Sequence, residues 1–175
     1  YNMLSQNLDA LPGIEVARFG MAVEIKPDHL QALQTAPNFA AADTVLVSFR
    51  YRRFAMDDLP RLLDLLADSG KHVVLTSRAP EFKADSPFTT VDLALRRDGK
   101  LDRDAIETAA WATRTVTPDH PINQRVAEYA KAYGFALLDK EPLLCDRAAE
   151  RCTMVTPDGR KVHFDYGHYT MHGAA

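Results

Sequence analysis

Short apolar segments alternate with amphipathic helices along most of this chain, and this alternation limits the folds open to it. Residues 43–49 and 72–77 are apolar runs typical of buried strands, and residues 57–69 between them repeat leucine at helical spacing. The pattern continues with a helix predicted over 121–133 and a buried strand over 135–139. Strands alternating with helices predict an α/β fold of three layers, with helices on both faces of a central parallel sheet.

Weaker patterns extend this arrangement toward both ends of the chain. A helix is predicted over residues 2–11, a strand over 14–19 and a short helix over 27–35. A further helix is predicted over 101–113, within a stretch that is otherwise less regular. The turn residues at 157–160 predict a hairpin. In parallel sheets, ligands bind beyond the carboxyl ends of the strands, so we expect the functional site there.

The size and composition of the chain exclude several classes of protein. Its 175 residues suffice for one domain with a hydrophobic core. The net charge of −3 and the scattered Lys and Arg residues give no electrostatic basis for binding nucleic acid. No apolar run approaches the roughly 20 residues that span a bilayer, and no segment has the features of a signal peptide. These observations leave the compartment of the protein open.

The two cysteines, Cys145 and Cys152, lie seven residues apart in a polar, loop-like segment. Metal sites usually pair cysteines about two to four residues apart and need further ligands. A local disulfide fits the spacing better and indicates an oxidising compartment. The alternative is two free thiols.

An aspartate and a histidine three residues apart, Asp165 and His168, follow the last apolar run of the chain. On a turn, this spacing can bring both side chains into one pocket. The Asp can then hold the imidazole in one tautomer, and the His can act as a general base toward a hydroxyl nucleophile. The alternative is a surface turn whose His caps the helix that follows. A metal site built from Asp165, His168 and His172 is disfavoured, because no third His or following Glu has a useful spacing, and we predict no metal or cofactor.

These residues together resemble the SGNH/GDSL hydrolase superfamily. The resemblance is closest to the extracytoplasmic SGNH domains found with membrane acyltransferases that O-acetylate bacterial polysaccharides. Residues 165–168 (DYGH) are similar to the closing D-x-x-H motif, residues 73–82 to the strand and proline loop before a variable insertion, and Cys145 with Cys152 to the cysteine pair of periplasmic members. The resemblance covers most of the chain and implies one flavodoxin-like α/β/α domain over residues 1–175.

The chain departs from the family pattern at two places. The family's nucleophile is the Ser of a Gly-Asp-Ser turn after the first strand, and this triplet is absent. Residues 1–4 resemble the helix that follows that turn, which implies that the first strand and the Ser lie upstream of Tyr1. The Asn of the family's Gly-x-Asn-Asp motif is also absent, because the matching strand end reads Ser48-Phe49-Arg50-Tyr51. Gly20 matches the oxyanion glycine of the family, and Arg50 is a second candidate for oxyanion support.

The resemblance implies a serine esterase or O-acetyltransferase that acts on a carbohydrate or polysaccharide through an upstream Ser, His168 and Asp165. It also implies a periplasmic or extracellular location and a membrane acyltransferase domain in the same or a neighbouring chain. Ser5, Ser48 and Ser77 lack the strained turn that exposes a nucleophile, so they are interpreted as helix or lining residues. The alternative is a catalytically inactive SGNH-like domain that binds carbohydrate or docks onto a partner. A flavodoxin-like binding domain would need a phosphate-binding loop or an acidic cluster, and the sequence shows neither.

Overall fold

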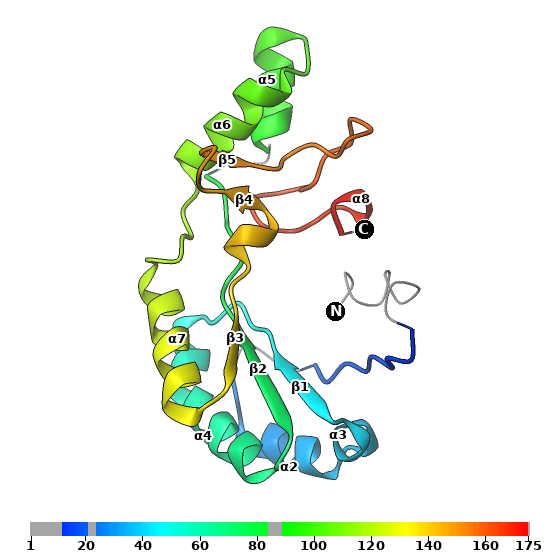
Figure 1. The fold of residues 1–175 in the computed structure, drawn as a ribbon, viewed down its shortest axis with the longest axis vertical. Coiled ribbons are helices and arrows are strands. Elements are labelled where there is room, and N and C mark those ends of the chain that lie inside the picture. The colour runs from blue at the N-terminus through cyan, green and yellow to red at the C-terminus, as the bar shows by residue number, and fades with distance from the viewer. Residues whose placement is uncertain (1–11, 21–23, 84–88, 175) are drawn as a thin grey trace. The chain divides into compact units, whose positions relative to one another are not determined.

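The computed structural model describes residues 12–20, 24–83 and 89–174, which form two compact units (Figure 1). The first, here called the sheet unit, comprises residues 17–78 and 118–139. The second, here called the dyad unit because it contains Asp165 and His168, comprises residues 1–16, 79–117 and 140–175.

The sheet unit is built on three parallel strands. Strands β1 (Thr44–Val47), β2 (His72–Thr76) and β3 (Ala136–Leu138) lie in the order β1-β2-β3, with Leu75 of β2 paired to Leu137 of β3. Each strand falls within a segment that the apolar pattern predicts. The parallel pairing is also as predicted, because each pair of strands is joined by a connection that contains a helix.

Two helices of these connections cover the sheet from the same side. Since the strand order is consecutive, right-handed crossovers place α4 (Arg53–Asp68) and α7 (Pro121–Tyr133) on one face, and Figure 1 shows them together on one side of the strands. Their buried side chains and those of the sheet form one core: Leu59, Leu62, Leu63, Leu66, Val126 and Ala130 with Val47, Val73 and Leu75. This burial is the main source of stability for the unit.

The opposite face of the sheet is less deeply buried. The pairing register puts Leu46, Val74 and Ala136 side by side on this face, followed by Leu138. Leu46 is 42% exposed and Leu138 is 39% exposed. The prediction that residues 135–139 form a buried strand is therefore wrong in its burial, because β3 lies at the sheet's edge and is exposed along its length.

Helix boundaries follow the sequence, except that α4 begins earlier than predicted. Helix α2 (Pro27–Thr35) has the predicted bounds, and the short α3 (Pro37–Ala41) follows it. Helix α4 begins at Arg53, four residues before the predicted start, and so holds Pro60 in its interior. The leucines that carry the helical period begin at Leu59, so the apolar pattern does not extend to the first turn of the helix. The burial of four α4 leucines compensates for the N–H that Pro60 lacks.

The strand predicted over 14–19 is wrong, because these residues have no regular secondary structure and pair with no strand of the described chain. Alternating side chains alone do not make a strand, which also needs a backbone partner. Ile14 is 56% exposed and Phe19 is 41% exposed. The helix predicted over 2–11 lies outside the described residues.

The dyad unit combines helices with short irregular strands. Its elements are α5 (Thr90–Asp98), α6 (Arg103–Thr113), the 3-10 helix η2 (Glu141–Leu143), β4 (Cys145–Asp146), β5 (Arg151–Cys152) and α8 (Met171–Ala174). The predicted disulfide joins Cys145 to Cys152 across the antiparallel β4-β5 pair. Both cysteines are buried in a core with Ile106 and Ala110 of α6. The predicted hairpin at 157–160 is a tight turn closed by the pairing of Val155 with Lys161.

Candidate active site

Asp165 organises the turn that carries His168. Its Oδ1 accepts hydrogen bonds from the backbone N–H groups of Gly167 (3.0 Å) and His168 (2.8 Å). Its Oδ2 lies 2.6 Å from Nδ1 of the His168 ring. One carboxylate oxygen thus closes the turn, and the other holds the imidazole. The three-residue spacing brings the two side chains together, as predicted.

The hydrogen bonds of the turn favour the ionised form of Asp165. Burial by itself raises the pKa of this carboxyl. The N–H groups of Gly167 and His168 and the ring of His168 outweigh that effect and lower the pKa below its usual value. An ionised Asp165 accepts a proton-bearing Nδ1, which leaves Nε2 as the basic nitrogen of a neutral His168. The His168 side chain is 58% exposed, so a substrate can reach it.

Backbone hydrogen bonds close the turn and join it to neighbouring loops of the dyad unit. Phe164 donates to the carbonyl of His168 (3.0 Å), and Thr170 donates to the carbonyl of Val162 (2.8 Å). Phe82 donates to the carbonyl of Tyr166 at 2.8 Å, and Thr115 donates to Glu81 at 2.7 Å. The proline loop predicted over 78–82 therefore contacts the turn of the dyad directly, through Phe82.

A glycine at 173 lets helix α8 pack against the backbone segment that leads into the turn. A Cβ at this position would lie 2.2 Å from the carbonyl oxygen of Val162, closer than any side chain allows. Gly173 is therefore required by the close approach of two backbones. Gly173 also donates to the Thr170 hydroxyl (3.0 Å), which ties α8 to the residues after the dyad.

A buried histidine that the sequence interpretation missed lies beneath the turn. His163 is 1% exposed and packs between Phe82 and Tyr169, with ring centroids 5.3 Å and 4.6 Å away. Neither of its ring nitrogens has a hydrogen-bond partner among the described residues. Burial lowers its pKa from 6.5 to about 4, so the ring is neutral near pH 7. Its place two residues before Asp165, in an apolar run, was the available signal.

The predicted oxyanion residues belong to the sheet unit. Gly20 is exposed, with open space where a Cβ would be, and Arg50 is an exposed residue shortly after β1. Ser77, at the end of β2, is buried and donates to Asp139 (3.0 Å), which supports its interpretation as a lining residue. The roles of Gly20 and Arg50 stay predictions.

No group of three or more His, Cys, Asp or Glu side chains is placed to hold a metal ion within residues 12–20, 24–83 and 89–174. His172 contacts Arg160, with 3.3 Å between its Nε2 and the guanidinium, and the Asp165 carboxylate is directed to His168. None of the described helices is both long and apolar enough to cross a bilayer.

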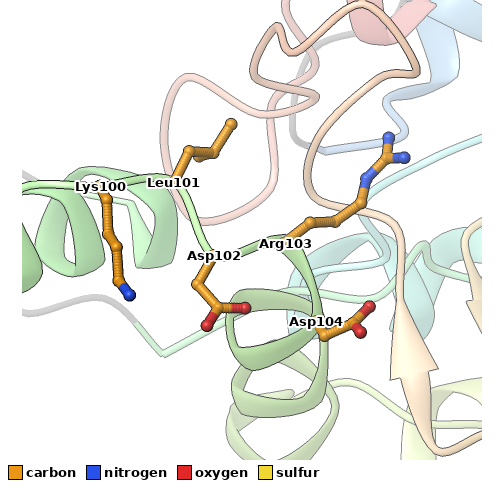
Figure 2. A pocket seen from close by; sticks show the side chains of 5 residues that line it. All are labelled: Lys100, Leu101, Asp102, Arg103 and Asp104. Atoms are coloured by element: carbon orange, nitrogen blue, oxygen red, sulfur yellow. The ribbon is translucent and has the colours of Figure 1, made fainter.

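A surface depression elsewhere in the dyad unit is lined by residues with structural roles. Figure 2 shows it between the ends of α5 and α6, with Lys100, Leu101, Asp102, Arg103 and Asp104 around it. Asp102 caps α6 by accepting from the N–H of Ala105, and Asp104 pairs with Arg151 (2.6 Å). The depression contains neither residue of the dyad.

Comparison with known families decides what kind of domain these elements form. A family model described as "SGNH domain (fused to AT3 domains)" matches residues 16–175. The chain belongs to this SGNH family. The matched range includes all three strands, the disulfide and the Asp165–His168 turn. The predicted SGNH resemblance and the three-layer α/β/α fold class are thereby confirmed.

One solved structure shares the fold of this SGNH domain. It is the periplasmic domain of a lipopolysaccharide acetyltransferase from Salmonella ser. Paratyphi A, with a TM-score of 0.58 at 12% sequence identity. The match covers 84% of this chain and 56% of the other, so the chain spans little more than half of that domain. At this identity the likeness shows the fold alone. A search of curated protein sequences gave no significant match.

Proposed function

We propose that this SGNH domain hydrolyses or transfers an acyl group, in particular acetyl, on a carbohydrate by a Ser-His-Asp mechanism. The observation that carries the proposal is the 2.6 Å contact between Asp165 Oδ2 and His168 Nδ1 on a half-exposed imidazole. This is the arrangement of a general base with its orienting carboxylate. Membership of a family fused to AT3 acyltransferase domains supports the acyl chemistry.

The dyad residues act on the proton of the nucleophile. Nε2 of His168 accepts the proton of a Ser hydroxyl as its oxygen attacks the acyl carbonyl, and Asp165 stabilises the imidazolium that forms. The imidazolium then gives this proton to the departing alkoxide, which leaves an acyl-serine. Water or a sugar hydroxyl attacks the acyl-serine with His168 again as base, giving the free acid or the transferred ester. Gly20 and Arg50 are our candidates for holding the oxyanion.

The nucleophile in this proposal comes from a Gly-Asp-Ser turn upstream of Tyr1. The sequence contains no such triplet, and the SGNH resemblance implies one after the first strand of the family fold. Strand β1 lies at an edge of the described sheet, so its outer backbone groups can pair with a further strand. A strand that ends in the nucleophile turn would add to the sheet at this edge.

The substrate and location are proposed from the family and from the disulfide. The fold neighbour is the periplasmic domain of a lipopolysaccharide acetyltransferase, and the Cys145–Cys152 disulfide requires an oxidising compartment to persist. We therefore propose a periplasmic or extracellular domain that receives acetyl groups from a membrane acyltransferase partner and places them on a polysaccharide.

The decisive experiment compares the 175-residue chain with a longer form that includes the proposed upstream turn, here called the full-length protein. A fluorophosphonate probe, which labels activated serines, is expected to label the full-length protein and not the shorter chain. Acetyl-ester turnover is expected to fall by about a thousandfold or more in Asp165→Asn, because the amide stabilises the wrong imidazole tautomer. The Asn oxygen still accepts the two backbone N–H groups, so the thermal midpoint should change little. His168→Gln should be equally inactive, and His172→Gln is the matched control with full turnover.

Two outcomes would overturn this proposal. Unchanged turnover in Asp165→Asn or His168→Gln would remove the dyad from the mechanism. Labelling of the 175-residue chain would place the nucleophile inside the present sequence.

A second candidate function is a non-catalytic SGNH domain that binds carbohydrate or a partner. The absence of the Gly-Asp-Ser triplet and of the family's Asn after β1 favours it. It predicts that the full-length protein is neither labelled nor active, but still binds acetylated polysaccharide.

A further inference from the structure

An aromatic ring lies flat against the His168 imidazole. The ring centroids of Phe164 and His168 are 5.5 Å apart, with an interplanar angle of 15°, which is a stacked arrangement. Tyr166 approaches the same imidazole edge-on, at 5.8 Å and 64°. The histidine is therefore held by Asp165 at one nitrogen and by Phe164 on one face.

Phe164 makes this contact at the expense of its own burial. Val162 and His163, just before it in the chain, are 4% and 1% exposed, whereas Phe164 is 57% exposed. Placing a large aromatic ring at the surface forgoes the free energy that burying it would provide. The hydrogen bond from its N–H to the His168 carbonyl closes the loop between the two residues and sets their rings side by side.

A single hydrogen bond at Nδ1 does not fix the tilt of the imidazole ring. The ring can tilt about its Nδ1 contact with Asp165, and such a tilt moves Nε2 away from the line of proton transfer. A ring stacked on one face opposes this tilt. It also faces the positive charge that His168 carries after it accepts a proton, and aromatic faces attract cations.

We propose that Phe164 is a positioning residue, which keeps the His168 ring in the plane where Nδ1 meets Asp165 and Nε2 faces the nucleophile. The proposal rests on the general-base role of His168 proposed above. Phe164 itself takes no proton and contacts no reacting atom. Its effect is on the orientation of the base and on the stability of the imidazolium.

The test compares Phe164→Leu with Phe164→Tyr in the full-length protein. Leucine keeps an apolar side chain but removes the aromatic face, and tyrosine keeps that face. We expect kcat to fall about two- to tenfold in Phe164→Leu with KM unchanged, the range that an aromatic pair typically contributes, and to recover in Phe164→Tyr. Phe19→Leu is the matched control, because Phe19 is an exposed phenylalanine of the sheet unit.

A second readout does not depend on turnover. The Nδ1 proton shared with Asp165 should give a far-downfield proton resonance, which His168→Gln removes and thereby assigns. This resonance should broaden in Phe164→Leu and persist in Phe164→Tyr, because a tilting ring exposes the proton to exchange with water.

The outcomes distinguish the positioning role of Phe164 from the proposed function. An unchanged resonance and unchanged kcat in Phe164→Leu overturn the positioning role. A broadened resonance with unchanged kcat also overturns it, because the orientation that Phe164 gives the His168 ring would then not contribute to catalysis. If the unmodified protein has no turnover, the proposed function fails, and the downfield proton alone shows whether Phe164 orders His168.

Discussion

The two units of this SGNH domain are stabilised in different ways. The sheet unit buries leucines and valines of regular helices and strands, and three of its leucines, Leu59, Leu63 and Leu75, are 0% exposed. The dyad unit has little regular structure around the dyad, and it relies on a disulfide, a glycine contact and backbone bonds between loops. Apolar packing thus provides a stable framework in one unit, and specific polar contacts fix the geometry of Asp165 and His168 in the other.

The dyad unit also buries groups that are costly to bury. Glu141 is 3% exposed and forms ion pairs with Arg147 (2.7 Å) and Arg114 (3.5 Å). Removing one partner from such a group leaves a buried charge uncompensated. His163 is buried without a hydrogen-bond partner in the described chain. The comparison teaches that apolar truncations should affect the sheet unit most, whereas pH and redox conditions should affect the dyad unit most.

The largest effect is expected from Leu63→Ala in α4. The side chain is fully buried, so the lost contacts and the cavity should lower the free energy of unfolding by about 4 kcal/mol. Leu65→Ala is the matched control on the same helix, because Leu65 is only half-buried, and it should cost about 1 kcal/mol. Far-UV circular dichroism during denaturation measures both.

The single tryptophan of the chain, Trp111, lies in α6 of the dyad unit and reports that unit by fluorescence. In Leu63→Ala, the circular-dichroism transition should shift and the fluorescence transition should stay in place. Equal shifts of the two transitions would show that the two units unfold together. The sheet unit and the dyad unit would then differ in their structure but not in their stability.

Acidification should destabilise the dyad unit through His163. In the unfolded chain this histidine takes up a proton near pH 6.5, whereas burial holds its folded-state pKa at about 4. Nearby Asp165 raises that pKa and His168 lowers it, both less than burial does. The contribution of His163 is thus complete above pH 6.5 and is lost as the pH falls to 4, by about 3 kcal/mol in all.

The comparison of wild type with His163→Phe isolates this effect. Other carboxyl groups titrate in both proteins, so only the difference between their Trp111 unfolding curves reports His163. That difference should grow between pH 6.5 and 4. A constant difference over this range would mean that the buried ring does not govern acid stability.

Reduction of the disulfide should have the smallest of the three effects. Cys145 and Cys152 lie only seven residues apart, and closing so short a loop stabilises a fold by about 2 kcal/mol. The double variant Cys145→Ala/Cys152→Ala should therefore lower the Trp111 transition and leave the sheet unit unaffected. Intact mass with and without reductant should differ by 2 Da in the wild type, and the same mass in both would show free thiols.

How far the sequence predicts the fold depends on local signals. Helix α7 has the predicted bounds because Pro121 begins it and Gly134, with a φ of 68°, ends it. Helix α5 was not predicted, because residues 83–119 lack a strong apolar period. Its signals were a capping box of Thr89 and Asp92 and the glycine at 99. Strand 14–19 could not be judged from its own residues, since its formation depends on a distant partner.

In the candidate site, too, the features that depend on local sequence are predicted and those that depend on distant residues are not. Asp165 and His168 lie only three residues apart, so their contact depends on local sequence and is predicted correctly. The stacking of Phe164 and the burial of His163 were not predicted, because they depend on how the turn folds back and on Phe82, some eighty positions earlier in the sequence. The matches of Gly20 and Arg50 to oxyanion residues rest on resemblance, and they stay predictions.

The two oxygens of the Asp165 carboxylate have different contacts, and this constrains which residues the position can accept. One oxygen accepts the backbone N–H groups of the turn, and the other contacts the imidazole of His168. A substitution of Asp165 that removes the acceptor oxygen loses the backbone hydrogen bonds of the turn together with the contact to His168, whereas Asn keeps the backbone hydrogen bonds. Changes at the neighbours of the turn can alter the surroundings of His168 and leave these backbone hydrogen bonds in place.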